Sequence, residues 1–291
     1  MKIAVIALGG NALQPSNEKW TYEGLERNIN KTVLHLAPLF AKYKVVITHG
    51  NGPEVGNLLI QQHSTKEVPE MPLDVCDAMT QGQLGYLLQR SIRSNLKKKA
   101  ITVVTQIEVD KNDRAFKNPT KPIGPFYKKK IERHMIKQKA GWRKVVPSPK
   151  PKRIIEIEEI KSLIKKGYTV IACGGGGIPV ANGKGVEAVI DKDYSTQLLA
   201  SQLKADLLVF LTDTDYVYFN YGTKNAVPIA RIKPKEMSKA LVSFPEEFKE
   251  GSMRPKIESS LKFLSKGKKV IITKPELLGK ALKEKAGTVI K

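Results

Sequence analysis

Three glycine-rich segments have the residue types needed to hold a phosphate group. Each follows an apolar, β-branched run, and the three are Gly9-Gly10-Asn11-Ala12, His49-Gly50-Asn51-Gly52-Pro53-Glu54-Val55-Gly56 and Gly174-Gly175-Gly176-Gly177. Glycine lets the backbone approach a ligand closely and lets successive N–H groups converge on phosphate oxygens, above all where a helix begins. Any one segment is equally well explained as a tight strand-to-helix turn. Three of them at one sheet edge favour a site for a polyphosphate.

Three lysines have settings suited to neutralising a phosphoryl group in transfer, a reaction that depends mainly on positioning and electrostatic stabilisation. Lys192 lies in Val189-Ile190-Asp191-Lys192-Asp193, where we expect Asp191 to orient Lys192 and Asp193 to cap a helix. Lys256 lies in Gly251-Ser252-Met253-Arg254-Pro255-Lys256, where Ser252 and Pro255 indicate a helix start. Lys121 lies in a proline-rich stretch. Each of the three is also explained as an exposed, solubilising side chain.

Other phosphate and metal motifs are absent or weak. Gly183-Lys184-Gly185 lacks both the glycine five residues earlier and the following Ser or Thr of a P-loop, so a P-loop NTPase is disfavoured. The Gly50–Gly56 segment is one residue too long for the dinucleotide fingerprint and follows the second strand, which leaves a Rossmann dehydrogenase as a weak alternative. Cys76 and Cys173 have no zinc-ligand spacing, so we predict no structural metal and no protein metal ligands.

The elements that must position these residues follow a strand–helix rhythm. Near-continuous Val/Ile/Leu runs alternate with helical segments, which predicts an α/β fold with a mainly parallel sheet covered on both faces. The predicted strands are Ile3–Leu8, Lys44–Thr48, Ile101–Ile107, Thr169–Cys173, Leu207–Thr212 and Lys269–Thr273. The predicted helices are Tyr22–Tyr43, Asp77–Lys98, Ile157–Lys166, Asp193–Leu203, Arg254–Lys266 and Pro275–Glu284. Ligands of such sheets bind beyond the carboxyl ends of the strands, where the glycine segments fall.

One segment breaks the rhythm. Residues 110–152 contain six prolines and no clear strand followed by a helix. A structureless loop of this length is unusual unless it is functional or disordered. We therefore expect an inserted lid or small subdomain within a single domain that spans residues 1–291.

Composition narrows the function classes further. The chain has 291 residues, 41% of them hydrophobic, and no apolar run of about 18–20 residues, so we expect no membrane span and a cytoplasmic protein. Fifty Lys and Arg against 28 Asp and Glu give a formal charge of +22, which attracts anions. The basic runs are scattered and carry no aromatic-interleaved motif, so specific nucleic-acid binding is not expected.

Taken together, these segments resemble the carbamate kinase branch of the amino acid kinase family over nearly the whole chain. The glycine segments are shared across that family, and two proline motifs point to the carbamate branch. The proline motifs are Asn118-Pro119-Thr120-Lys121-Pro122-Ile123-Gly124-Pro125-Phe126-Tyr127 and Trp142-Arg143-Lys144-Val145-Val146-Pro147-Ser148-Pro149. Further carriers are Ile6–Leu13, Thr48–Pro53, Gly174–Val180, Glu187–Asp193 and Gly251-Ser252-Met253.

The resemblance implies a three-layer αβα fold with a protruding subdomain over the active site, a homodimer, and reversible Mg²⁺-dependent phosphoryl transfer between ATP and carbamate in arginine metabolism. It places the transferred phosphoryl group and carbamate, or carbamoyl phosphate, among Gly9, Gly10, Asn11, Gly50, Asn51 and Gly52. It gives catalytic roles to Lys121, Lys192, Lys256 and Asp191, the last holding the lysines. It places ADP or ATP beside Gly174, Gly175, Thr212, Asp213 and Met253.

Two alternatives stay open at this point. A related kinase could phosphorylate another small acceptor with the same glycine segments and lysines. A basic protein with a kinase fold could instead bind nucleic acid, because the charge of +22 suits a polyanion.

Overall fold

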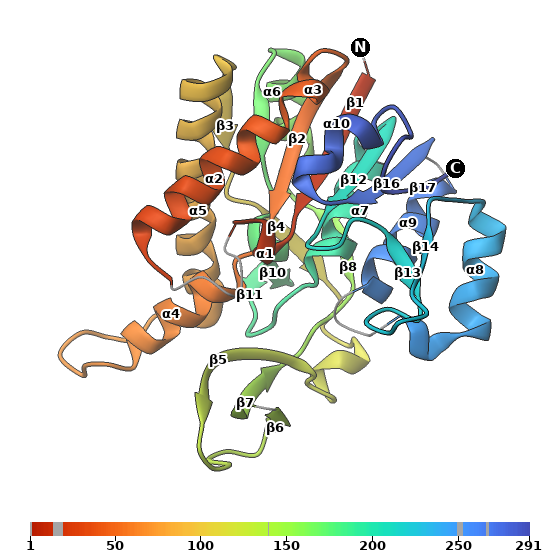
Figure 1. The fold of residues 1–291 in the computed structure, drawn as a ribbon. Coiled ribbons are helices and arrows are strands. Elements are labelled where there is room, and N and C mark those ends of the chain that lie inside the picture. The colour runs from red at the N-terminus through yellow and green to blue at the C-terminus, as the bar shows by residue number, and fades with distance from the viewer. Residues whose placement is uncertain (1, 14–19, 139, 249–252, 266–267) are drawn as a thin grey trace.

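The protein folds as a three-layer αβα sandwich with smaller sheets below its central sheet (Figure 1). The computed structural model describes residues 2–13, 20–138, 140–248, 253–265 and 268–291, without the side chains of residues 11 and 12. No helix in these ranges is long and apolar enough to cross a membrane. The α/β class expected from the sequence is therefore confirmed, together with its mainly parallel sheet.

The central sheet places every predicted phosphate segment at one edge. Its order is β15 (Arg231–Ile232), β17 (Thr288–Ile290), β16 (Lys269–Thr273), β12 (Leu207–Leu211), β1 (Lys2–Leu8), β2 (Tyr43–His49), β9 (Thr169–Ile171) and β3 (Ala100–Thr102). Neighbouring strands from β16 to β3 are all parallel, whereas β17 is antiparallel to β16. The carboxyl ends of β1, β2 and β12 therefore open toward the same end of the molecule.

Helices cover both faces of this sheet. One face carries α2 (Tyr22–His35), α3 (Ala37–Phe40), α5 (Leu73–Leu96) and α10 (Leu278–Ala281). The other face carries α6 (Ile157–Lys165), α7 (Lys192–Gln202), α8 (Pro234–Ser243) and α9 (Met253–Leu264). Alternation along β1 explains the two layers, because Ala4, Ile6 and Leu8 pack on the first set while Val5 and Ala7 pack on the second.

Smaller elements complete the fold. A four-stranded sheet contains β11 (Lys184–Gly185), β10 (Ile178–Ala181), β4 (Gln106–Val109) and β8 (Pro151–Ile154), and a two-stranded one contains β13 (Val217–Phe219) and β14 (Val227–Ile229). Each glycine segment begins a helical element: the short helix α1 (Gly10–Leu13), the longer helix α4 (Gly52–Gln62) and the 3₁₀ turn η2 (Gly174–Gly176). Three further 3₁₀ turns are η1 (Arg114–Phe116), η3 (Pro245–Glu247) and η4 (Pro275–Leu277).

Three predicted elements are wrong in their extent. The run Ile101–Ile107 is two strands, because β3 joins the central sheet and β4 joins the four-stranded sheet. The predicted helix Tyr22–Tyr43 is divided into α2 and α3, and Tyr43 already belongs to β2. Pro275–Glu284 forms η4 and α10, and its last residue has left-handed backbone (φ 58°).

Residues 110–152 are not a structureless loop. They contain the antiparallel sheet of β5 (Lys121–Tyr127), β7 (Gly141–Val146) and β6 (Met135–Gln138), with β5 and β6 both paired to β7. The expectation that this segment lacks clear strands is thus wrong, since prolines 122 and 125 lie inside an edge strand that tolerates missing N–H donors. In Figure 1 this sheet projects below the main body.

Candidate active site

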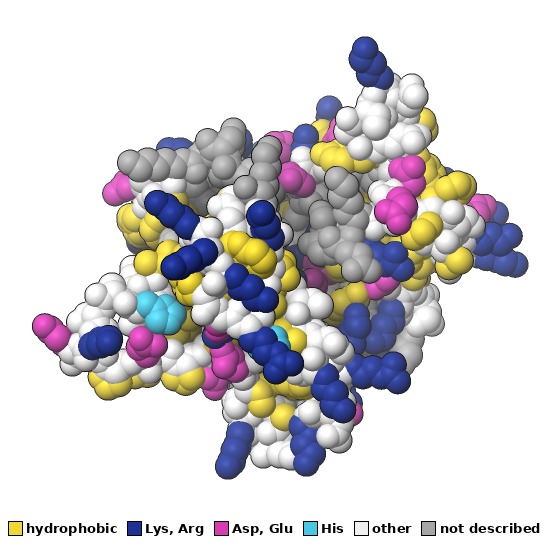
Figure 2. Space-filling model, turned by 90° about the horizontal axis from the view of Figure 1, so that it is seen from below, with side chains coloured by type: hydrophobic (Ala, Val, Ile, Leu, Met, Phe, Trp, Pro, Cys, Tyr) yellow, Lys and Arg dark blue, Asp and Glu magenta, His cyan; other side chains and the backbone are white. Residues whose placement is uncertain are grey.

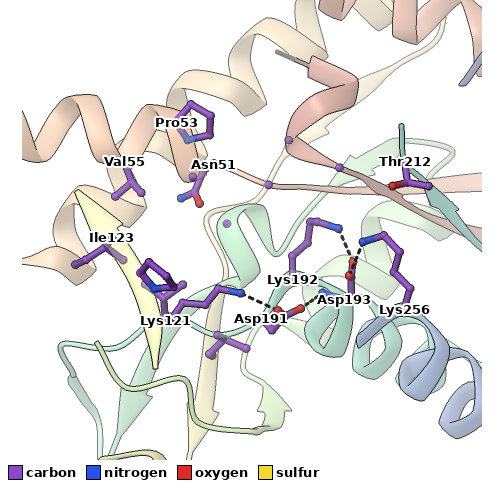
Figure 3. Close-up of a pocket in the computed structure, with 18 of the residues that line it drawn as sticks. Asn51, Pro53, Val55, Lys121, Ile123, Asp191, Lys192, Asp193, Thr212 and Lys256 are labelled. Atoms are coloured by element: carbon purple, nitrogen blue, oxygen red, sulfur yellow. Dashed lines mark hydrogen bonds and ion pairs between the residues drawn. The ribbon is translucent and has the colours of Figure 1, made fainter. Parts of the chain in front are cut away.

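A cavity of about 370 Å³ opens at the carboxyl ends of β1, β2 and β12 (Figure 3). Its walls combine backbone from the glycine segments with charged side chains from β5, α7 and α9. Twelve of the residues predicted from the sequence line it, namely Gly9, Gly10, Gly50, Asn51, Gly52, Lys121, Gly175, Asp191, Lys192, Thr212, Asp213 and Lys256. The structure thus brings together residues that are more than 240 positions apart in the chain.

The glycine segments meet backbone to backbone. Gly9 N donates to Leu211 O and Gly50 N donates to Leu8 O, both at 3.0 Å, so the strand ends are tied to one another. A Cβ at Gly9 would lie 2.9 Å from Leu211 O, and one at Gly50 would lie 3.4 Å from Gly10 N. Larger residues would therefore push the strand ends apart and widen the floor of the cavity.

Two aspartates hold the three lysines. Lys192 Nζ lies 2.5 Å from Asp193 Oδ1, and Lys256 Nζ lies 3.0 Å from Asp193 Oδ2. Lys121 Nζ, which reaches over from β5, lies 2.7 Å from Asp191 Oδ2. Figure 3 shows the three ammonium groups converging from separate elements onto this pair of carboxylates. The side chains carry one net positive charge, which suits the binding of an anion.

The expected roles of the two aspartates are wrong in part. Asp191, not Asp193, caps α7, because its Oδ1 accepts the N–H of Asp193 at 2.9 Å. Asp191 holds only Lys121, and Asp193 holds Lys192 and Lys256. The sequence pattern Asp-Lys-Asp does not distinguish the two carboxylates, since either one can precede a helix.

Burial and charge act against each other at Asp193. Burial alone raises the pKa of its carboxyl, but the ammonium groups of Lys192 and Lys256 outweigh burial and hold that pKa at about 2. Burial lowers the pKa of Lys192, and Asp193 opposes this effect. The Asp193 carboxyl is therefore ionised at neutral pH and available as the counter-charge of the two lysines.

Arg143 was not among the predicted site residues, although it lines the cavity. It lies on β7, donates from Nε to Gly124 O at 2.9 Å, and stacks 5.2 Å from the centre of the Phe126 ring. Its position next to Trp142 in a proline-flanked motif was the available sequence signal. The guanidinium adds a planar cation on the β5–β7 side of the cavity.

A buried polar layer supports the glycine segments. The imidazole of His49 is 1% exposed, and burial lowers its pKa to about 4, so it is neutral. Its Nδ1 lies 3.1 Å from Gly50 O, which makes it a hydrogen-bonding side chain of the loop. Gly174 packs here rather than in the cavity, since a Cβ there would lie 2.5 Å from His49 Nε2.

The comparisons with known proteins agree with this architecture. A sequence model described as the amino acid kinase family matches residues 2–274. The chain belongs to the amino acid kinase family. Curated members similar to it are a carbamate kinase of Pyrococcus horikoshii, 44% identical with 98% of each chain covered, and one of Staphylococcus haemolyticus, 44% identical with 100% of each covered.

Solved structures of this family also superpose on the chain. Carbamate kinase from Giardia lamblia bound to AMP-PNP has a TM-score of 0.92 at 39% identity and covers 99% of this chain and 98% of its own. The product complex of T. acidophilum isopentenyl phosphate kinase, at 16% identity and a TM-score of 0.59, shares the fold alone. Among these kinases the full-length similarity is to the carbamate branch, so the resemblance drawn from the motifs is confirmed.

A second cavity of about 320 Å³ adjoins the first in this amino acid kinase. Thr212 and Asp213 line both cavities, and Met253 lines only the second. Three tyrosines complete it, with Tyr218 5.8 Å from Tyr221 and 6.2 Å from Tyr216 between ring centres. Aromatic faces beside a cavity lined by lysines suit a ligand with a flat heterocycle and a negatively charged group.

Some predicted residues cannot be placed. Asn11 belongs to α1, but its side chain lies outside the described part of the structure, as do Gly251 and Ser252 entirely. Among the described residues, no group of three His, Cys, Asp or Glu side chains is placed to hold a metal ion.

Proposed function

We propose that this protein transfers a phosphoryl group reversibly between ATP and carbamate, and that it makes ATP from ADP and carbamoyl phosphate in the reverse direction. The observation that carries the proposal is the convergence of Lys121, Lys192 and Lys256 on one cavity floored by glycine backbone. The curated relatives covering the full chain are named carbamate kinases, which supports this choice of acceptor.

The side chains have a division of labour that suits this reaction. Carbamate is already an anion, so it attacks without a general base and needs placement and charge neutralisation. Lys192 and Lys256 face the transferring phosphoryl group from α7 and α9, and Lys121 approaches from β5. Backbone N–H groups of Gly10, Asn51 and Gly52 bind its oxygens. The N–H groups of Gly9 and Gly50 instead hold the strand ends together.

The nucleotide occupies the second cavity in this proposal. Its phosphates extend past Thr212 and Asp213 into the lysine cavity, and its base lies against the tyrosines near Met253. A Giardia relative was solved with AMP-PNP, which supports the use of an adenine nucleotide. Gly175 lines the lysine cavity, whereas Gly174 acts from beneath, through its contact with the His49 side chain.

Magnesium, when bound, would neutralise part of the negative charge on the nucleotide phosphates. The donor set fits this, because Asp213 lines both cavities with an exposed carboxylate, whose Oδ1 lies 3.1 Å from the Thr212 hydroxyl. Mg²⁺ commonly binds through one carboxylate, substrate phosphates and water. Asp213 is therefore the residue that would contact it.

Two further assignments belong to the same proposal. The β5–β7 sheet, within residues 110–152, closes over the cavity as a small subdomain and carries Lys121 with it.

The protein works as a cytoplasmic homodimer, for which an exposed apolar stripe on α5 offers a surface. Val75, Met79 and Tyr86 form that stripe, with exposed fractions of 37%, 47% and 56%.

The deciding experiment measures ATP formed from ADP, carbamoyl phosphate and Mg²⁺. We expect activity in the wild type and losses of about 100-fold or more in kcat for Lys192→Ala and Lys256→Ala, because each removes a charge aimed at the phosphoryl group. Lys161→Ala, which removes an exposed ion pair with Glu158, is the matched control. Activity with a different acyl phosphate only would change the acceptor, and near-normal kinetics in both variants would refute the lysine roles.

A further inference from the structure

Asn51 has both hydrogens of its side-chain amide committed beneath the cavity. Its Nδ2 donates to Asp77 Oδ1 and, at 2.8 Å, to Thr80 Oγ1. The hydroxyl of Thr80 donates its own hydrogen to Asp77 O at 2.8 Å, so towards Asn51 it can only accept. Asp77 and Thr80 therefore fix the orientation of the Asn51 amide, with Nδ2 toward α5 and Oδ1 on the opposite side.

The surroundings of this pair make the orientation rigid. Asn51, Asp77 and Thr80 are 5%, 8% and 0% exposed. Gly175, with φ of 67°, lies directly against Asn51 Nδ2 and Asp77 Oδ1, where any Cβ would collide with both. An unpaired amide N–H here would be costly, which opposes a flip of the amide.

With its nitrogen held below, Asn51 presents its oxygen Oδ1 to the cavity that it lines (Figure 3). An oxygen that only accepts hydrogen bonds is an unusual partner in a cavity built for anions. It repels carboxylate and phosphate oxygens, but it suits an uncharged N–H group on the same small ligand. Carbamate and carbamoyl phosphate carry such a group, whereas acetate and acetyl phosphate carry a methyl group of similar size in its place.

We propose that Asn51, oriented by Asp77 and Thr80, accepts a hydrogen bond at Oδ1 from the amino group of the substrate. The site thereby selects carbamoyl over acetyl compounds. The inference rests on the proposed function, and it assigns Asp77 and Thr80 as positioning residues that do not touch the substrate. A site with a committed acceptor disfavours a methyl group, because its oxygen would lose water without gaining a hydrogen bond.

The test compares carbamoyl phosphate with acetyl phosphate as phosphoryl donors to ADP. The quantity measured is the ratio of the two kcat/KM values, since a general loss of structure lowers both donors and leaves the ratio unchanged. We expect Asp77→Ala to reduce the wild-type preference for carbamoyl phosphate at least about tenfold, mostly by slowing the carbamoyl reaction. Thr80→Val, which keeps the side-chain shape, should shift the ratio the same way by about threefold or more.

Thr80→Ser is the matched control, because serine keeps the accepting hydroxyl and should keep the wild-type ratio. If Asp77→Ala does not fold, the comparison of Thr80→Val with Thr80→Ser still decides. A ratio unchanged in Thr80→Val, or a wild type that uses both donors equally well, overturns the inference while the kinase assignment stands. A wild type that makes no ATP from carbamoyl phosphate overturns the proposed function as well.

Discussion

The negative charge of Asp193 holds Lys192 and Lys256 close to each other in the cavity. One carboxylate, 4% exposed, pairs with Lys192 and Lys256 at once. In Asp193→Asn the two ammonium groups would face each other without a counter-charge, which favours neutral lysine and disturbs its position. We expect kcat for ATP formation to fall about 100-fold or more and urea unfolding to show a loss of about 3 kcal/mol. Glu158→Gln, in an exposed pair, should change neither, and a fully active Asp193→Asn would contradict this role.

The buried carboxyl group of Glu54 makes the free energy of unfolding depend on pH. Burial raises the pKa of its carboxyl to about 7 in the folded protein, above about 4.3 when unfolded. The folded state therefore holds the proton more tightly, and its stabilising contribution is complete below pH 4 and lost as pH rises through 7. Replacing Glu54 by Gln should remove about 3–4 kcal/mol of this pH dependence between pH 4 and 8. Unfolding midpoints of both proteins across that range test it, and parallel curves would disprove it.

At the scale of elements, β5 carries Lys121, a catalytic side chain in the proposed function, on a small sheet that reaches the main body through ion pairs of two kinds. Lys121 pairs with Asp191 inside the cavity, and Lys144 of β7 pairs with Glu187 outside it, where their side chains are 38% and 60% exposed. We expect Lys121→Ala to lower kcat at least tenfold, and Lys144→Ala to change it less than twofold, because exposed pairs contribute little. Steady-state kinetics on both variants measure the difference. Equal effects would show that both ion pairs only attach the small sheet to the main body and that Lys121 has no separate role in the reaction.

The elements also show how far sequence reasoning reached. Strand cores such as Leu207–Leu211 were predictable because they are continuously apolar, and the glycines after them marked the cavity edge. The division of residues 101–107 was not, since Val103 to Thr105 continue the apolar run while the chain changes sheets. The buried contact of Asn51 with Asp77 was hidden too, because it joins the residue that precedes α4 to the first turns of α5, 26 residues away.

At the scale of the molecule, the α5 stripe predicts how two copies meet. Val75, Met79 and Tyr86 lie on one face of the helix and remain exposed in the single chain. Burying such a stripe against its symmetry mate is the simplest way to form a homodimer. Met79→Lys should shift the mass measured by light scattering from dimer toward monomer, and Val242→Lys on α8, at the other side of Figure 1, should not. A monomeric wild type would refute the dimer.

The charge of +22 acts over the whole surface rather than at one docking face. Lys97-Lys98-Lys99 and Lys268-Lys269 lie at the end of the central sheet away from the cavity, whereas Lys128-Lys129-Lys130 follow β5 at the opposite end (Figure 1). On the face shown in Figure 2, Lys and Arg side chains are interspersed with acidic and apolar ones. On that face, such a distribution attracts small anions without aligning many cations along one polymer.

We therefore expect duplex DNA to bind with a Kd weaker than roughly 10 µM at physiological salt, and to leave the rate of ATP formation unchanged. The value of kcat/KM for carbamoyl phosphate should instead decrease as ionic strength rises, because screening weakens long-range attraction of an anionic substrate. Fluorescence anisotropy with labelled DNA and a salt series of the kinase assay measure the two effects. Submicromolar DNA binding with a steep salt dependence would favour a polyanion-binding role, because it would show that many lysines contact successive phosphates at once.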